Sequence, residues 1–369
     1  MNNHTSITLQ FIGDISLNGL FCNPQHHQAV ADNMSEIAAR LGSCDLRIGN
    51  FESPVWGTGG VNKLKSPRLC TTRQTAECLR PLGLDVALLA NNHVYDCLED
   101  GFANTTGFLN DIGVKWLGAG TSETDAARPL VLNCGDMSLG LLNYVGAETN
   151  PSLPDNSGVF VNWLDKDRVL QDVVNLATQV DKVLVFVHWG TVEQVRYPEV
   201  RHRRLARSAI DAGAQVFVGC HAHCLQGDEQ WGSGHIFYGM GNFLFSPLLG
   251  SPGEILRSWP ELSRSIGLAR CKLSSRGVTD VSWLFLHQGR HDLTLQVDQR
   301  PRRAKMQRKI SEVLKQSDTR LARSLRLESR FIMPFRNYVD QSGGLLGAIC
   351  SIRPRHWRAL SAMFRRRKT

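Results

Sequence analysis

The stretch Gln215-Val216-Phe217-Val218-Gly219-Cys220-His221-Ala222-His223-Cys224 places two histidines directly after an apolar, β-branched run. Such a run predicts a buried strand, and α/β proteins bind ligands at the carboxyl ends of their strands. Residues i and i+2 of an extended chain point the same way, so we expect His221 and His223 on one face of the strand. Cys220, Ala222 and Cys224 would take the other face. Two imidazoles on one face can hold a divalent metal, which makes this stretch the centre of the predicted site.

Polar side chains also follow four other apolar runs, at residues 7–12, 45–48, 85–90 and 182–187. The polar residues are Asp14; Asn50 and Glu52; Asn92 and His93; and His188. Apolar residues at helical spacing predict helices over 30–41, 99–111, 164–180 and 198–212. Residues 130–133 and 138–145 are typical of a hairpin, and 266–273 and 278–287 of antiparallel strands. This alternation of strand, polar loop and helix predicts an α/β fold.

The charge of the 369-residue chain is divided unevenly along its length. The net charge is +8, but residues 301–369 hold 18 Lys and Arg against 4 Asp and Glu, which leaves −6 for residues 1–300. We therefore expect a catalytic domain over residues 1–299 and a basic, mainly helical extension over 300–369. The ten cysteines form no C-x-x-C pair, and we find neither a secretory signal nor a transmembrane segment. Reduced thiols and cytoplasmic residence are expected.

The strand ends together offer carboxylate, amide and imidazole groups, enough for one or two metals. This mixed set suits Mn, Fe or Zn better than the all-oxygen shell that Mg or Ca prefers. A pair of such metals can activate water and stabilise the charge that develops on a phosphoryl group. Hydrolysis of a phosphoester is therefore the predicted chemistry.

Six separated motifs occur in order between residues 7 and 247: Gly13-Asp14; Asn50-Phe51-Glu52; Ala90-Asn91-Asn92-His93 with Asp96; His188-Trp189-Gly190; Gly219-Cys220-His221-Ala222-His223; and Tyr238-Gly239-Met240-Gly241-Asn242-Phe243. In this order they resemble the CapA family of poly-γ-glutamate and capsule synthesis proteins, which is similar to the calcineurin-like metallophosphatases.

The resemblance implies a four-layer α-β-β-α sandwich of two mixed sheets, with a metal centre at the strand ends. By likeness to the metallophosphatase pattern, six residues look like metal ligands: Asp14, Glu52, Asn92, His188, His221 and His223. His93 looks like the general acid that protonates a leaving oxygen, and the ordinary histidine pKa of about 6.5 suits that role. Asn242 looks like a residue of the catalytic site just outside the ligands.

The chain departs from the family's pattern at three places that leave these ligands intact. The family usually has a third His and a Pro where Cys220 and Ala222 stand. It usually has Gly soon after the Asp of the third motif, where this chain has Cys97-Leu98. It also has an Arg after the first motif, where Asn18-Gly19 stand. These departures bear on substrate contacts and on loop shape.

Simpler structural roles remain open for several of these residues. Asp14, Glu52 and Asn92 could cap helices or turns, and a lone histidine at a strand end is often only hydrogen-bonded. Cys220 and Cys224 could supply thiolates to a zinc site, although alternation along a strand favours packing. Four arginines could line an anionic substrate path or form a solvated helix face: Arg196, Arg201, Arg203 and Arg204.

The basic tail carries two apolar stripes opposite Arg and Lys. The first consists of Met306, Ile310, Val313, Leu314, Leu321 and Leu325, and the second of Trp357, Leu360 and Phe364. The second stripe, opposite the Arg run, favours peripheral contact of the tail with the anionic surface of the inner membrane, and a solvated extension is the alternative. Nucleic acid is not expected as a partner, because the tail has no recognisable reading module.

These features predict a metal-dependent hydrolase that acts on a phosphoester or an anionic polymer. It would take part in the synthesis or modification of capsule, exopolysaccharide or poly-γ-glutamate. The alternative is a non-catalytic accessory protein that binds nascent anionic polymer and tethers a synthase at the inner membrane.

Overall fold

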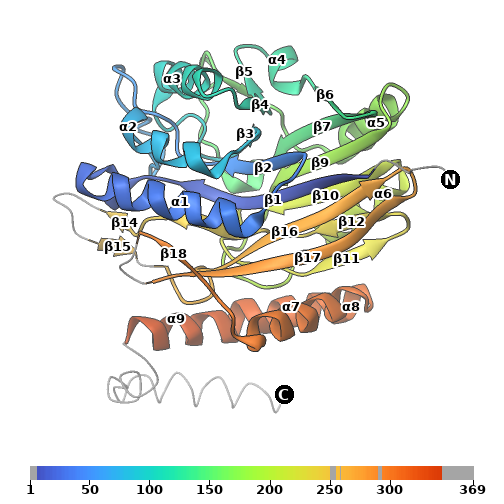
Figure 1. Cartoon of the computed structure of the whole chain (residues 1–369). Helices are drawn as coiled ribbons and strands as arrows, with labels where there is room; N and C mark the ends of the chain where they lie inside the picture. The colour runs from blue at the N-terminus through green and yellow to red at the C-terminus, as the bar shows by residue number, and fades with distance from the viewer. Residues whose placement is uncertain (1–5, 250–254, 258, 290–292, 343–369) are drawn as a thin grey trace.

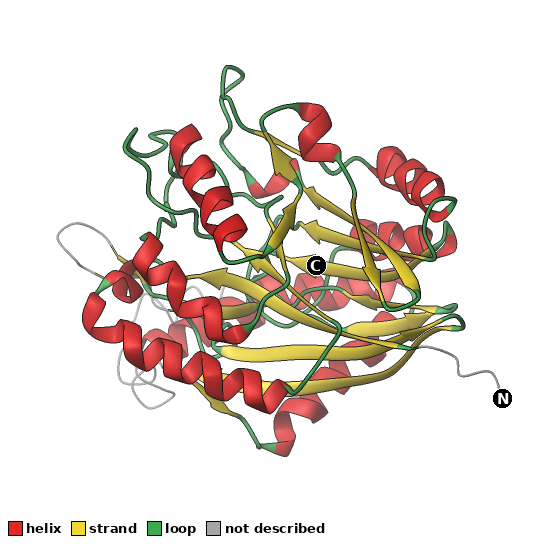
Figure 2. Cartoon of the chain, turned by 45° about the horizontal axis from the view of Figure 1, so that its top comes forward, coloured by secondary structure: helices red, strands yellow, loops and turns green. Residues whose placement is uncertain are grey.

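Two mixed β-sheets packed face to face form the centre of the computed structural model, which describes residues 6–249, 255–257, 259–289 and 293–342 (Figure 1). Helices cover the outer sides of both sheets, and Figure 2 shows them surrounding the strands. The predicted four-layer α-β-β-α sandwich is therefore confirmed.

The first sheet has eight strands in the order β18-β17-β16-β1-β2-β3-β4, and β13 also pairs with β1. The strands β1 to β4 and β13 run parallel, whereas β16, β17 and β18 are antiparallel to their neighbours. Their bounds are β1 Ile7–Ser16, β2 Leu46–Phe51, β3 Val86–Leu88, β4 Lys115–Leu117, β13 Asn242–Phe245, β16 Ser265–Ser274, β17 Gly277–Gln288 and β18 Leu295–Val297.

The second sheet has six strands in the order β11-β12-β10-β9-β7-β6. The central strands β7, β9, β10 and β12 are parallel, and β6 and β11 are antiparallel edges, so the predicted hairpin of β6 and β7 is confirmed. Their bounds are β6 Leu130–Cys134, β7 Met137–Val145, β9 Lys182–His188, β10 Ala214–Cys220, β11 Asp228–Trp231 and β12 Gly234–Phe237. Two short ladders pair β5 Ala119–Gly120 with β8 Phe160–Val161, and β14 Leu248–Leu249 with β15 Ile255–Arg257.

Side-chain alternation along the strands separates three apolar cores. In β10, Val216 and Val218 lie between the two sheets, while Phe217 packs against the outer helices. The first sheet is covered by α1 His27–Leu41, α2 Arg73–Ala76 and α3 Leu98–Asp111. The second sheet is covered by α5 Lys166–Ala177 and α6 Val200–Asp211. A further short helix, α4, spans Glu123–Ala127. The predicted helices are thus present, with bounds that differ by a few residues.

The C-terminal extension forms α7 Pro301–Leu314, α8 Asp318–Leu327, a π-helical turn Glu328–Ile332 and α9 Met333–Gln341, which lie below the two sheets in Figure 1. Ile310, Leu314 and Leu321 of the predicted apolar stripe are fully buried, and the last two belong to the core outside the second sheet. The stripe therefore packs on the protein itself. The second stripe, with Trp357, Leu360 and Phe364, lies outside the described residues.

No helix among the described residues is both long enough and apolar enough to cross a membrane.

The end of β1 is fixed by a close backbone approach. The amide of Asp14 donates to the carbonyl of Gly241 at 2.8 Å, and a Cβ on Gly13 would collide with that same carbonyl. Only glycine at position 13 allows β13 to lie this close to β1. The approach holds Asp14 opposite Asn242 and beside Asn50 of β2.

Candidate metal centre

The loop that follows β10 is not an extension of the strand. The strand ends at Cys220, and His221 and His223 have φ values of 88° and 51°, in the left-handed region. The prediction that both imidazoles share one face of an extended segment is therefore wrong, because strand alternation stops where the pairing stops. The loop nevertheless brings the two rings to 5.8 Å between centroids.

Backbone contacts on both sides hold this loop. The amide of His221 donates to Oδ2 of Asp14 at 3.2 Å, and the carbonyl of Ala222 accepts from the amide of Gln194 at 2.7 Å. The loop is thus tied to the first sheet through β1 and to the segment that follows β9.

The six predicted ligands come from both sheets. Asp14 lies near the end of β1, Glu52 directly follows β2, Asn92 follows β3, His188 ends β9, and the remaining two histidines follow β10. Within the first sheet β1, β2 and β3 run parallel, and within the second sheet β9 and β10 do, so the carboxyl ends of each group lie at one edge of their sheet. The contacts of His188 with Asn92 and of His221 with Asp14 bring these two edges together. All six side chains are buried.

One half of the cluster gathers around His188. Its Nε2 lies 2.9 Å from Oδ1 of Asn92, 3.0 Å from Nδ1 of His221 and 3.8 Å from Oε1 of Glu52. A single proton on Nε2 can serve only one of these neighbours, so atoms that carry lone pairs face one another. Such a convergence of donor atoms fits a shared cation.

The other half of the cluster joins Asp14 and His223. Their Oδ2 and Nδ1 atoms are 3.5 Å apart, and Nδ1 of His223 is also 2.8 Å from Oδ1 of Asn242. Asn50 donates from Nδ2 to Oδ1 of Asp14 at 2.8 Å. Asn242 thus lies directly beside His223, and its amide oxygen can orient the imidazole.

Glu52 lies between the two halves and has no hydrogen-bond partner. Both carboxylate oxygens are fully buried, and burial, followed by the charge of Asp14, raises its pKa well above the usual range. One atom each of Glu52, His221 and His223 lie within 4.8 Å of one another. A buried carboxylate without a partner is costly unless a cation compensates it, so these residues fit a metal.

The histidines are held in the form that binds metals. Burial lowers the pKa of His188 well below its ordinary value and lowers that of His221 to about 3, with the neighbouring imidazoles adding to the shift. Both rings are therefore neutral at physiological pH, and neutral imidazole is the ligand form.

The two flanking cysteines differ in their surroundings. Cys224 donates from Sγ to the carbonyl of Val195 at 3.2 Å and packs against Ala222 and Leu262. Burial, followed by the charges of Asp14 and Glu52, raises the pKa of Cys220 well above its ordinary value, so it remains a thiol. Neither belongs to the cluster of potential ligands found among the described residues.

His93 lies beside the ligands and is paired with a carboxylate. Its Nδ1 is 2.6 Å from Oδ2 of Asp96, and its Nε2 is 3.9 Å from Oε1 of Glu52. Burial lowers the pKa of His93, and Asp96 opposes that shift. Asp96 stands in the third motif, but the sequence did not indicate that it orients the ring.

A cavity of about 160 Å³ opens onto this edge of the molecule. Asn92, His93 and His223 form its floor, and the walls include Lys65, Glu193, Phe245 and Trp259. Sequence reasoning missed these wall residues, because Lys65 and Trp259 lie in irregular segments far from any motif.

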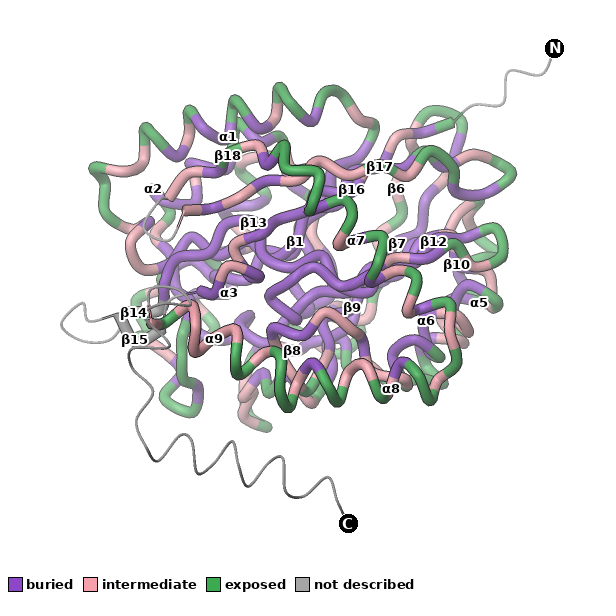
Figure 3. Tube along the Cα trace, turned by 90° about the horizontal axis from the view of Figure 1, so that it is seen from below, coloured by how far each residue is buried: buried purple, intermediate pink, exposed green. Residues whose placement is uncertain are grey.

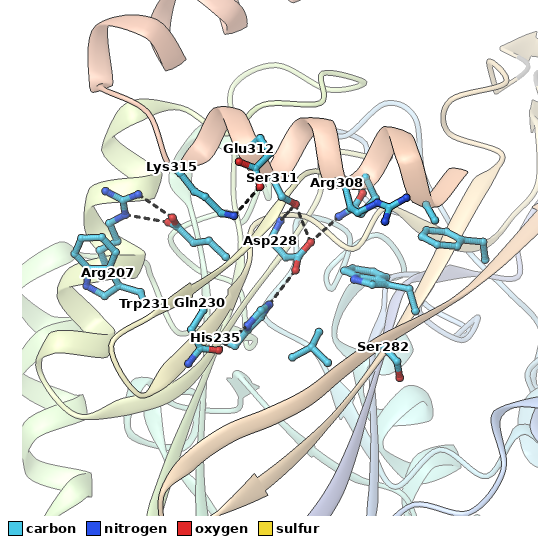
Figure 4. Close-up of a pocket in the computed structure, with 16 residues that line it drawn as sticks. Arg207, Asp228, Gln230, Trp231, His235, Ser282, Arg308, Ser311, Glu312 and Lys315 are labelled. Atoms are coloured by element: carbon cyan, nitrogen blue, oxygen red, sulfur yellow. Dashed lines mark hydrogen bonds and ion pairs between the residues drawn. The ribbon is translucent and has the colours of Figure 1, made fainter. Parts of the chain in front are cut away.

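A larger cavity of about 790 Å³ lies between α7, β11, β12 and β17 (Figure 4). It contains none of the predicted site residues. Its three carboxylates are already engaged, Asp228 by His235 and Gln307, Glu229 by Arg207, and Glu312 by Lys315. None of these three carboxylates therefore lacks a partner in the way that Glu52 of the candidate metal centre does.

The four arginines near His188 form ion pairs rather than line the smaller cavity. Arg196 pairs with Glu328, Arg201 with Glu148 and Glu199, and Arg203 and Arg204 with Asp318. Arg203 is buried and also donates to the carbonyl of Leu314. Three of them thus fasten the C-terminal helices to the sandwich.

Comparison with protein families and curated proteins gives consistent matches. The profile described as "Bacterial capsule synthesis protein PGA_cap" matches residues 8–247. The chain is 27% identical over 251 residues to the capsule biosynthesis protein CapA of Bacillus anthracis, covering 65% of this chain and 60% of that protein. It is 28% identical over 251 residues to the PGA biosynthesis protein CapA of Bacillus subtilis (strain 168), covering 65% and 63%. The chain therefore spans about three fifths of the length of these relatives.

A third relative is named for an accessory role. It is a probable polyglutamine synthesis accessory protein of Mycobacterium tuberculosis (strain CDC 1551 / Oshkosh), 29% identical over 213 residues, covering 54% of this chain and 55% of that protein. Among solved structures, a hypothetical protein from Thermus thermophilus has a TM-score of 0.47 and 18% identity, over 77% of this chain and 100% of that one. A 5′-nucleotidase precursor from the same organism has a TM-score of 0.43 and 16% identity, over 89% and 59%.

Proposed function

Since the chain belongs to the bacterial capsule synthesis protein family PGA_cap, we propose that it is a metal-dependent, phosphoesterase-type hydrolase that acts in capsule, exopolysaccharide or poly-γ-glutamate synthesis. The observation that carries this proposal is Glu52, a fully buried carboxylate without a partner between two groups of ligand atoms. A protein that only binds a polymer has no need of such a centre.

The ligand atoms divide into two groups that would hold one or two Mn, Fe or Zn ions. One group is Asn92, His188 and His221, and the other is Asp14 and His223, with Glu52 shared between them. When bound, the metal supplies Lewis-acid chemistry for attack of water on a phosphoryl group.

His93 is the proposed proton donor. In the neutral ring, Nδ1–H donates a hydrogen bond to Oδ2 of Asp96, and Nε2 carries a lone pair on the side of the cavity. A bound anionic substrate would raise the pKa of His93, so that Nε2 takes up a proton and passes it to the leaving oxygen. Asp96 stabilises the imidazolium that forms in this step.

The cavity walls would position the substrate. Lys65 is buried at the rim, and its Nζ donates to the carbonyl of Asn150 at 2.5 Å. Its ammonium would attract an anionic group of the substrate, while Phe245 and Trp259 exclude water on the opposite wall.

The test combines elemental analysis with hydrolysis of an aryl phosphate by the purified full chain. Wild-type protein is expected to contain Mn, Fe or Zn and to hydrolyse the ester, and His221→Ala/His223→Ala should lose both properties. His93→Ala should keep its metal and lose about 10²- to 10⁴-fold in kcat. His235→Gln, a buried histidine outside the site, serves as the control that keeps both. Metal content unchanged in the double variant would overturn the ligand assignment.

The non-catalytic accessory role is the second candidate, because one relative is named as an accessory protein. It would bind nascent anionic polymer and tether a synthase. Retained metal without hydrolysis of any phosphoester or peptide, together with co-purification of a membrane glycosyltransferase or ligase, would favour this role.

A further inference from the structure

Four large apolar side chains lie exposed on one side of α8 and α9. Leu327, Phe331, Ile332 and Phe335 are 47%, 41%, 37% and 61% exposed. They are four of the nine exposed large apolar residues in the described part of the chain, although they span only nine positions. Single exposed apolar residues are normal on soluble proteins, whereas a contiguous group marks an interaction surface.

The helix that carries this group is fixed in orientation. Leu327, Ile332 and Met333 all have right-handed helical angles, so α8, the π-helical turn and α9 form one continuous rod. On the inner side, Leu321 is fully buried, and the buried carboxylate of Glu328 lies between Arg196 and Arg336 at 2.5 and 2.9 Å. The rod therefore cannot rotate to bury its apolar side, and Figure 3 shows the tube of α8 and α9 from below with exposed residues along it.

Basic side chains flank the apolar group. Arg323, Arg326 and Arg330 are exposed, and none of them forms an ion pair with a carboxylate of the described residues. Glu328, the one acidic residue within 319–339, is turned inward. The outer side of residues 319–339 is thus apolar and positively charged, and these residues expose no carboxylate.

We propose that this surface, formed by Arg323, Arg326, Leu327, Arg330, Phe331, Ile332 and Phe335, docks on an anionic lipid surface. Guanidinium groups would bind the lipid phosphates while Leu and Phe enter the boundary between headgroups and acyl chains. A second copy of the chain is a poorer occupant, because its arginines would face these arginines. Residues 343–369, which follow directly, contain seven Arg and Lys and no Asp or Glu, which adds to the same attraction.

The proposal does not depend on the proposed hydrolysis, but it places the metal centre near the lipid surface. Asn337 of α9 donates to Oε1 of Gln194 at 3.0 Å, and the neighbouring Glu193 lines the cavity above the metal cluster.

The test is co-sedimentation of the full chain with vesicles of phosphatidylcholine alone or mixed with phosphatidylglycerol. Binding is expected only to the mixed vesicles and should weaken as salt rises. Arg323→Gln/Arg326→Gln/Arg330→Gln should lower the partition coefficient about 100-fold at low salt, and Phe331→Ala/Phe335→Ala at least about tenfold. Lys305→Gln/Arg308→Gln/Lys309→Gln removes the same charge from exposed positions of α7 and should leave most of the binding. Unchanged thermal unfolding would show that the exposed substitutions leave the fold intact.

Three results would overturn the proposal. The first is equal binding to neutral and anionic vesicles. The second is wild-type binding by both surface variants, which would assign the attraction to residues 343–369 alone. The third is a dimer in analytical ultracentrifugation that Phe331→Ala/Phe335→Ala dissociates, which would make a second copy the occupant.

Discussion

His221 and His223 occupy backbone conformations that non-glycine residues rarely adopt, and each costs about 1–3 kcal/mol. The hydrogen bonds to Asp14 and Gln194 hold the loop against that cost. The strained loop brings one ring atom of each histidine within 4.8 Å of the other and of a carboxylate oxygen of Glu52.

The identity of the important residues was more predictable than their geometry. Polar stretches after apolar runs indicated where the candidates lie, the resemblance to the metallophosphatase pattern implied which six would be ligands, and the structure brings these six close together. The turn after Cys220 was not predictable, since it depends on β13 and on the segment around Gln194. The wall residues Lys65 and Trp259 were missed for the same reason: only tertiary contacts bring them to the cavity.

Glu148 provides a test of pH-dependent stability at a single residue. Its hydrogen bond to His202 and the charge of Arg201 lower its pKa to about 2, although burial opposes the shift. A lowered pKa in the folded state stabilises the protein above the ordinary glutamate pKa, and this contribution is lost as pH falls toward 2. We expect Glu148→Gln to be about 2–3 kcal/mol less stable than wild type at pH 7 and equally stable near pH 2.

Chemical denaturation across this pH range measures the difference. Glu36→Gln, which removes an exposed pair with Arg40, should change stability by less than about 0.5 kcal/mol at any pH. A difference for Glu148→Gln that does not vary with pH would show that its charge is not the cause.

The C-terminal helices are the elements whose role differs most from the prediction. The apolar stripe that includes Ile310, Leu314 and Leu321 was predicted as one side of a helix with no stated partner, and it packs against the protein outside the second sheet. Helical periodicity identifies an apolar side but not what covers it. The exposed side of α8 and α9 could be recognised only from the structure, because the contacts of Leu321 and Glu328 determine which side faces the protein.

Glu328 is the anchor whose removal should loosen this element. It is fully buried and lies between Arg196 and Arg336, so Glu328→Gln leaves both guanidiniums without a carboxylate. We expect a loss of about 2–4 kcal/mol in urea unfolding, with faster hydrogen exchange over 190–199 and 318–341. Glu312→Gln breaks an exposed pair with Lys315 and should cost less than about 0.5 kcal/mol. Equal urea midpoints for the two variants would contradict a buried anchor.

At the scale of the whole molecule, the alternation of strands and helices predicts only an α/β fold, and it was the resemblance to the CapA family that implied the four-layer sandwich. The strand order was not predictable. β13 joins the first sheet beside β1, although the strands before it, from β9 to β12, belong to the second sheet. No local pattern in 242–245 reveals that this strand joins the first sheet. The chain before β13 can approach β1 this closely because Gly13 has no Cβ.

The ligand candidates come from both sheets, so a bound metal should stabilise the whole sandwich. At a free metal concentration of about 100 times Kd, binding adds about 2.7 kcal/mol to the unfolding free energy and should raise Tm by a few degrees. We expect a chelator to lower Tm of the wild type by that amount and to leave His221→Ala/His223→Ala unchanged. Calorimetry with and without chelator measures this, and an equal response in both proteins would argue against a metal that joins the sheets.

The contact between Asp14 and His221 spans 207 positions of the chain. β1 is synthesised well before β13 and β16, yet it lies between β2 on one side and those two later strands on the other. The first sheet therefore cannot be completed until residues near 274 have left the ribosome, and such long-range pairing is slow. The candidate metal centre is thus among the last parts of the protein to form, and a metal would be loaded there only after synthesis of the sandwich is complete.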